Sequence, residues 1–191
     1  VIGLNLNTRD PQIIVASLLT QDSNKKTIAR FPNLTTLDLS YSNISNQDVI
    51  KIIQIYNNLR HLNLYECGFL TNAAGSIIAK NSKELRTLNI GIADISVHHL
   101  ISDPTLKALA EHCKHLEELR IEKCDPTDVG IIEIAKACPK LIKLDLYECT
   151  QITDAALDAI KDNCPNFKML IIDECPEITF TAVQELARSC K

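Results

Sequence analysis

Residues 138–164 read CPKLIKLDLYECTQITDAALDAIKDNC, and this stretch contains the pattern of one structural unit. Its opening leucines have the spacing L-x-x-L-x-L, whose last two members alternate as on one face of a short strand. Apolar residues then recur at helical spacing over 155–160, just after Thr153, a residue type that favours helix N-caps. The stretch predicts a strand, a turn and a helix, which can bury their apolar faces only by stacking on copies of themselves.

Imperfect copies of this unit run along the whole chain. The first leucine of the pattern, or its equivalent, stands at Leu34, Leu59, Leu85, Leu116, Leu141 and Phe167. These positions are 25, 26, 31, 25 and 26 residues apart, and a broken strand at residues 4–6 precedes them. The period predicts one α/β domain over residues 1–191, a leucine-rich-repeat solenoid with about six full repeats and a partial first one. We expect a right-handed horseshoe arc with parallel strands on its concave face and helices on its convex face.

Cysteines recur at two fixed positions of the repeat, and their spacing indicates which class of leucine-rich repeat the chain resembles. One set stands three residues before the first leucine, as Cys113, Cys138 and Cys164, and Cys190 would open a further repeat. The other follows it by eight: Cys67, Cys124, Cys149 and Cys175. With C-P-x-L at 138–141 and I-T-D at 152–154, the chain resembles the cysteine-containing leucine-rich-repeat class, known from F-box proteins and mitotic-exit antagonists. F-box proteins are substrate receptors of cullin-based ubiquitin ligases, so the resemblance implies a substrate-recognition region.

The composition excludes several classes of partner. A net charge of −4 provides no basic field for nucleic acid or an anionic membrane surface. No apolar run approaches the roughly 20 residues of a membrane span. The chain starts at Val1 and stops at a repeat boundary without an evident capping repeat, so we expect a fragment of a longer protein, with any F-box before Val1.

The eight cysteines predict buried free thiols rather than disulfides. Each occupies a repeated core position, where side chains point the same way and do not meet as a disulfide requires. Free thiols favour a reducing compartment, so we expect a cytoplasmic or nuclear protein.

Residue types that favour turns and helix ends predict most of the remaining helices and turns. We expect a helix over 11–20, a polar turn over 21–26, and a helix near 103 that begins at Ser102-Asp103-Pro104. Gly130 should weaken its helix slightly. The predicted N-caps of the other helices are Ser45, with Asp48 completing a capping box, and Thr71, Thr127 and Thr153.

The third repeat is about five residues longer than the others, with the extra length in Gly91–Leu100. This segment holds Asp94 and the pair His98-His99. Extra length in a solenoid lies at the surface, where a loop either drifts neutrally or contacts a partner. The sequence leaves both readings open.

No residues point to catalysis, a cofactor or a metal. The sequence contains no Gly-rich phosphate loop, no G-x-S-x-G and no H-E-x-x-H. His112 and His115 flank Cys113, but that cysteine is a core position and the histidines fill surface positions of the repeat. We therefore interpret them as surface residues rather than as zinc ligands.

The strand face opposite the helices is the expected binding surface. Between the last two leucines the repeats read Asp38, Asn63, Asn89, Arg120, Asp145 and Ile171. The position after the last leucine reads Ser40, Tyr65, Gly91, Glu122, Tyr147 and Asp173, and the next reads Tyr41, Glu66, Ile92, Lys123, Glu148 and Glu174. From these positions we predict the following partner-binding residues: Tyr41, Tyr65, Glu66, Arg120, Glu122, Asp145, Tyr147, Glu148, Asp173 and Glu174. Tyrosine is enriched at interfaces, and the excess of acids would complement a basic partner.

The sequence thus predicts a non-enzymatic protein-interaction module without a cofactor. The first hypothesis is the substrate-recognition region of an F-box-type ubiquitin ligase subunit, whose other ligase components would bind outside this chain. The alternative is a free-standing repeat scaffold or regulator unrelated to ubiquitination. An acidic face could also be a solvated surface that only keeps the solenoid soluble.

Overall fold

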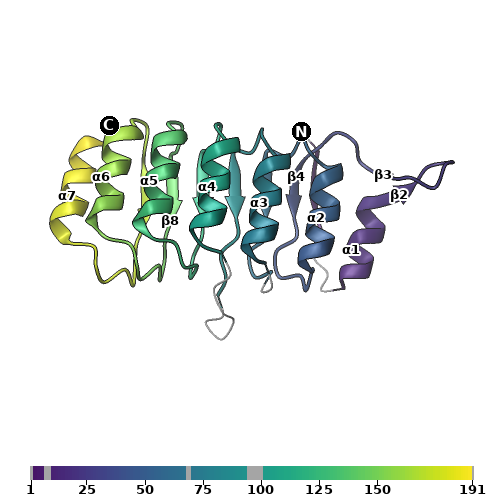
Figure 1. Cartoon of the computed structure of the whole chain (residues 1–191), viewed down its shortest axis with the longest axis horizontal. Coiled ribbons are helices and arrows are strands. Elements are labelled where there is room, and N and C mark those ends of the chain that lie inside the picture. Colours follow the sequence, from purple (N-terminus) through teal and green to yellow (C-terminus); the bar gives the residue numbers. More distant parts are fainter. Residues whose placement is uncertain (1, 7–9, 68–69, 94–100, 191) are drawn as a thin grey trace.

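The repeats form one continuous row of strands and helices in the computed structural model, which describes residues 2–6, 10–67, 70–93 and 101–190. Figure 1 shows the helices side by side in chain order, with the strands as a second layer behind them. The helices are α1 Pro11–Leu18, α2 Asn46–Ile55, α3 Asn72–Asn81, α4 Asp103–His112, α5 Asp128–Ala137, α6 Asp154–Asn163 and α7 Phe180–Ser189. Each helix contacts its neighbours in the row, so the layer is built from adjacent pairs.

Seven short parallel strands form one sheet in the order β1-β4-β5-β6-β7-β8-β9. They are β1 Ile2–Asn5, β4 Leu34–Asp38, β5 His61–Asn63, β6 Thr87–Asn89, β7 Glu118–Arg120, β8 Lys143–Asp145 and β9 Met169–Ile171. The second leucine of each pattern is in register from Leu37 to Leu170. The predicted α/β leucine-rich-repeat solenoid is confirmed.

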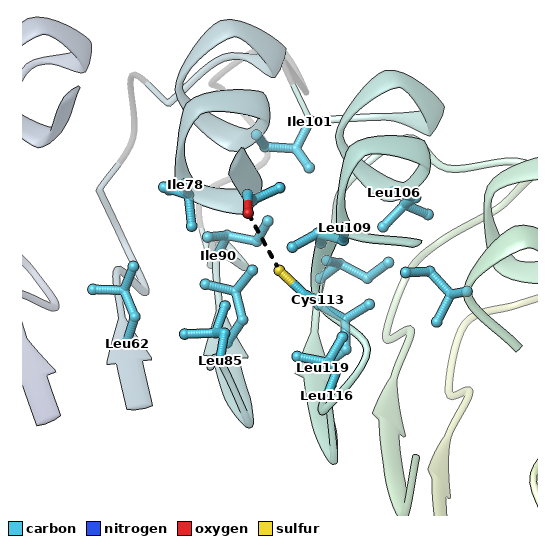
Figure 2. Packing of buried hydrophobic residues seen from close by; sticks show 14 of the residues in the cluster. Leu62, Ile78, Leu85, Ile90, Ile101, Leu106, Leu109, Cys113, Leu116 and Leu119 are labelled. Atoms are coloured by element: carbon cyan, nitrogen blue, oxygen red, sulfur yellow. Dashed lines mark hydrogen bonds between the residues drawn. The ribbon is translucent and has the colours of Figure 1, made fainter. Parts of the chain in front are cut away.

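The core lies between the sheet and the helices and runs the length of the row. The first leucine of every repeat is buried, and so are seven of the eight cysteines; Cys190 is partly exposed. Figure 2 shows Cys113 pointing into this cluster beside Leu85, Leu109 and Leu116. All eight thiols are free, as the sequence predicts.

The buried thiols also satisfy backbone carbonyls of the preceding repeat. Cys138 donates to the carbonyl of Cys113 at 3.4 Å, and Cys149 donates to that of Ile121 at 3.3 Å. Cys67, Cys124 and Cys175 make the same contact in their repeats. The two cysteine positions therefore connect neighbouring repeats as well as fill space, because a buried carbonyl needs a partner.

A second set of cross-repeat bonds connects the helix starts. From α2 to α6, the first residue of each helix accepts a hydrogen bond from the backbone N–H of the next N-cap residue, as Asp103 does from Thr127 at 2.9 Å. The acceptors in order are Asn46, Asn72, Asp103, Asp128 and Asp154, and the N-caps are Thr71, Ser102, Thr127, Thr153 and Thr179. This N-cap ladder gives the I-T-D motif its structural role.

Two local predictions need correction. Helix α1 ends at Leu18, and the chain then forms a hairpin of β2 Leu19–Gln21 and β3 Thr27–Ala29, where only a turn was expected. Gly130 is not simply a weak helix residue, because a Cβ there would lie 2.5 Å from Asp103 Oδ1 and 2.6 Å from Leu106 Cδ1. Ser102 precedes α4 as predicted but makes no side-chain cap bond.

Candidate protein-binding face

The face of the sheet away from the helices, which we call the open face, presents parallel rows of side chains. On β5, β6 and β7 the central leucine is buried toward the helices, whereas its two neighbours are half-buried on the other side. Each row takes one residue from each repeat, because the strands are parallel and in register. Rows of this kind form a surface whose residues can vary without changing the core.

The row between the last two leucines has a structural role. Asp38, Asn63, Asn89 and Asp145 each accept the backbone N–H two residues further on, at 3.0 to 3.2 Å. These side chains shape the turn that leaves the strand. These four side chains therefore serve the fold in addition to any contact with a partner. Asp145 is also only 4% exposed, so a partner could reach it only through the surrounding hollow.

The last predicted row lies on a turn with left-handed backbone geometry. Tyr41, Glu66, Lys123, Glu148 and Glu174 have φ between 57° and 60°, a region that few residues other than glycine adopt. In the third repeat, Ile92 at the same position is not among the left-handed residues. The shared geometry places five side chains along one rim of the open face.

Several rim residues are already engaged with other parts of the chain. Glu66 accepts the backbone N–H of Ala93, and Lys123 donates to the Ala93 carbonyl at 2.7 Å. Lys123 also forms an ion pair with Glu148 at 2.9 Å. These contacts hold residue 93, in the predicted insertion of 91–100, against the rim; residues 94–100, with Asp94, His98 and His99, lie outside the described residues.

The structure brings four of the predicted residues together around one hollow of about 330 Å³. We call it the tyrosine hollow. Tyr65, Glu122, Asp145 and Tyr147 line it, together with Ile92, Ala93, Lys123 and Ile171. The Tyr41 ring packs edge-on against that of Tyr65, with centroids 5.5 Å apart, and extends the aromatic surface to the rim.

The other predicted residues lie around the tyrosine hollow or away from it. Glu148 and Glu174 line a second hollow, of about 410 Å³, beside Pro176. Asp173 is exposed, and its backbone carbonyl accepts the Glu148 N–H at 2.9 Å. Arg120 belongs to a third hollow of about 230 Å³ and lies 4.0 Å from Glu118.

This third hollow contains residues that the sequence analysis missed. Its lining includes the row before the second leucine, which reads Thr36, His61, Thr87 and Glu118. His61 Nδ1 lies 3.0 Å from the Thr87 hydroxyl. Strand alternation places this row on the same face as the two rows after it, so the period of two would have identified it.

One carboxyl on the open face has a strongly altered acidity. Burial, together with a hydrogen bond to Asp145 and its charge, raises the pKa of Glu122 to about 7. The charges of Arg120 and Lys143 act in the opposite direction. Desolvation also raises the pKa of Tyr65, and Glu122 adds to this effect. The tyrosine hollow is therefore a partly dry and acidic part of the face.

No metal or membrane site emerges from the described part of the chain. Within it, no three His, Cys, Asp or Glu side chains are grouped to hold a metal ion. His112 lies 3.8 Å from Glu111, and His115 lies 3.2 Å from Lys140. None of the described helices has the length and apolar character to cross a membrane.

Comparison with known proteins identifies the repeat class. A leucine-rich-repeat family profile matches residues 32–52 and 112–135. The chain is 28% identical over 138 residues to the F-box protein SKIP1 of Arabidopsis thaliana, covering 65% of this chain and 46% of that protein. It is 34% identical over 100 residues to the antagonist of mitotic exit network protein 1 of Eremothecium gossypii, covering 52% and 25%.

Other matches are consistent with a shared module in different proteins. The mouse lysine-specific demethylase 2B is 30% identical over 132 residues, which cover 64% of this chain and 10% of the demethylase. The chain thus spans less than half the length of each of these relatives. Among solved structures, the complex of Rad7 and Elc1 from yeast matches with a TM-score of 0.54 at 19% identity, covering 84% of this chain and 48% of the matched chain. This last likeness shows the fold.

Proposed function

We propose that the chain is a member of the cysteine-containing leucine-rich-repeat class of its F-box and mitotic-exit-antagonist relatives, and that its open face binds another protein. The observation that carries this proposal is the tyrosine hollow. Its tyrosines are half-buried on the open face, outside the leucine core, and the solenoid builds its core without them. Tyrosines around an acidic depression are the kind of surface that protein interfaces use.

The finer proposal is that the chain recognises substrates for an F-box-type ubiquitin ligase. The resemblance to an F-box protein supports it, and the ligase components would then bind sequence outside residues 1–191. The second candidate is a repeat scaffold independent of ubiquitination, favoured by the match to a mitotic-exit antagonist. Both assign the chain a binding role, with no catalytic residue and no cofactor. The buried free thiols support a reducing compartment, the cytosol or the nucleus, for either.

Affinity capture from a cell lysate tests the binding role. We would compare the unchanged chain with a triple variant carrying Tyr65→Ala, Tyr147→Ala and Glu148→Ala. The matched control places three alanines at exposed helix positions, Glu133, Lys136 and Asp158. Circular dichroism first establishes that all three chains fold.

We expect proteins that the control retains and the open-face variant loses. Equal capture by both variants would overturn the open face as the binding surface. Ligase components and ubiquitinated forms among the lost proteins, when the full-length protein is used, would distinguish a substrate receptor from a scaffold.

A further inference from the structure

One row of the open face lacks a side chain beside the tyrosine hollow. The row reads Tyr65, Gly91, Glu122, Tyr147 across four neighbouring strands. A Cβ at Gly91 would lie 2.8 Å from Glu122 Oε2 and 3.0 Å from the Glu122 backbone nitrogen. No described glycine has positive φ, so closeness rather than backbone conformation requires glycine here. The gap lets the Glu122 carboxylate lie back between the two tyrosines.

The floor and walls of this hollow have distinct chemistry. Glu122 and the nearly buried Asp145 line its acidic end. Ile92, Ala93 and Ile171 add apolar surface, and Tyr65 and Tyr147 add ring faces. A long side chain with an apolar stem and a cationic head would match all three kinds of surface.

The two carboxyl groups of the hollow form no ion pair in the described part of the chain, although Arg120 and Lys143 are near enough for their charges to act on Glu122. Among the described residues, no lysine or arginine lies within ion-pair distance of Glu122 or Asp145. Lys123 lines the hollow, but its ammonium is 2.9 Å from Glu148 and is bonded to the Ala93 carbonyl. It also lies 5.6 Å from the Tyr147 ring centroid, so this wall already holds one cation against a tyrosine.

We propose that the tyrosine hollow holds an arginine side chain of the protein partner. A guanidinium is planar, so it can bond the Glu122–Asp145 pair through two N–H groups while stacking on a tyrosine. A lysine ammonium offers neither the fork nor the flat surface. The inference rests on the proposed function, since it names the side chain that an open-face partner would insert, and charge complementarity selects this occupant.

Titration with single amino-acid probes tests the inference without knowledge of the partner. The chain, labelled with ¹³C in its tyrosine rings, is titrated with N-acetyl-arginine methylamide and followed by NMR. The citrulline analogue keeps the shape without the charge, and the lysine and aspartate analogues represent other occupants. We expect saturable shifts at Tyr65 and Tyr147, with little change at the buried Tyr56. Citrulline should bind about tenfold more weakly, because it loses the charge-assisted bonds.

Two conservative variants test whether the Glu122 and Asp145 carboxylates bind the arginine probe. Glu122→Gln should weaken arginine binding about tenfold, whereas Glu133→Gln on α5 changes the net charge equally and should have no effect. Asp145→Asn is a second test that preserves the fold, because Asn63 and Asn89 form the same turn in other repeats.

The outcomes separate this inference from the proposed function. Equal binding of arginine and citrulline, tighter binding of the lysine or aspartate analogue, or no response to either carboxylate variant would overturn the arginine site. If capture still depends on the open face in that case, the binding role stands and only its chemistry is wrong. If capture is indifferent to the open face, the proposed function fails, whatever the titration shows.

Discussion

Asp128 and Thr153 are joined by two hydrogen bonds across neighbouring repeats. Asp128 Oδ1 accepts the Thr153 backbone N–H at 2.9 Å, and Oδ2 accepts its hydroxyl at 2.6 Å. The threonine oxygen in turn accepts the N–H of Ala155 and caps α6. One aspartate therefore begins its own helix, where a negative charge is favourable, and fixes the start of the next.

Asp128→Ala should lower the free energy of unfolding by about 2 kcal/mol, because two bonds are lost and the Thr153 N–H loses its partner. Urea unfolding followed by circular dichroism measures the change. Asp158→Ala on α6 is the control: its carboxylate pairs with Lys161 at an exposed site, so its removal should change stability by less than about 0.5 kcal/mol. Similar losses in the two variants would contradict a special role for the N-cap ladder.

Gly130→Ala should destabilise the chain although alanine is the better helix former. Helix propensity alone would favour alanine by about 1 kcal/mol. The added methyl would collide with Asp103 and Leu106, so we expect a net loss of about 1–3 kcal/mol. Val129→Ala, at the neighbouring 64% exposed position, should be nearly neutral. A gain in the thermal midpoint of Gly130→Ala would show that α4 and α5 are less closely packed than the structure has them.

The native chain should expose one reactive thiol. Burial raises the pKa of Cys113 and of Cys124 to about 12, and that of Cys138 to about 11, so their thiolates are scarce at pH 8. Cys190 is the partly exposed exception. A thiol reagent should label about one cysteine rapidly and all eight after unfolding, and Cys190→Ser should remove the rapid phase. Rapid labelling of several thiols would contradict the packed core.

Stability should fall as the pH rises through the titration of Glu122. Its pKa is about 7 in the folded chain against a usual 4.5, so the folded state retains a proton that the unfolded state has lost. The stability associated with this proton is complete below pH 4.5 and is lost as the pH passes 7. Asp145 disfavours the charged form of Glu122, while Arg120 and Lys143 favour it.

Glu122→Gln should remove this dependence. The variant should gain more stability over the unchanged chain at pH 8 than at pH 4.5, as measured by urea unfolding at the two values. Glu174→Gln, at an exposed rim site, corrects for the change in net charge. Parallel stability curves for Glu122→Gln and the unchanged chain would rule out a raised pKa at this residue.

The repeats could be predicted from the sequence because their signals recur. Six leucine patterns, two cysteine positions and the caps Thr71, Thr127 and Thr153 support one another, so errors in one copy are corrected by the rest. The β2–β3 hairpin occurs once, outside the period. It depends on Asp22, whose side chain accepts the N–H groups of Asn24 and Lys26, a local arrangement that a search for repeats does not detect.

The binding face was less predictable because a side chain can point to the surface and still have a structural role. The sequence analysis identified the row of Tyr65 and Tyr147, which line the hollow. Asp145 was predicted to contact a partner, but the hydrogen bond by which its side chain closes a turn was not predicted. Gly91 was interpreted as the start of an insertion, whereas its missing side chain leaves room for the Glu122 carboxylate on the next strand. The effect of a missing side chain can be recognised only once neighbouring strands are placed in register.

The five left-handed rim positions have a consequence for how recognition could be changed. Tyr41, Glu66, Lys123, Glu148 and Glu174 differ in size and charge yet have nearly the same backbone geometry. Side chains could therefore be transplanted from one repeat to another without a new turn having to be designed. The rim positions are equivalent in backbone geometry. A change of partner would therefore require different side chains at these positions rather than a new fold.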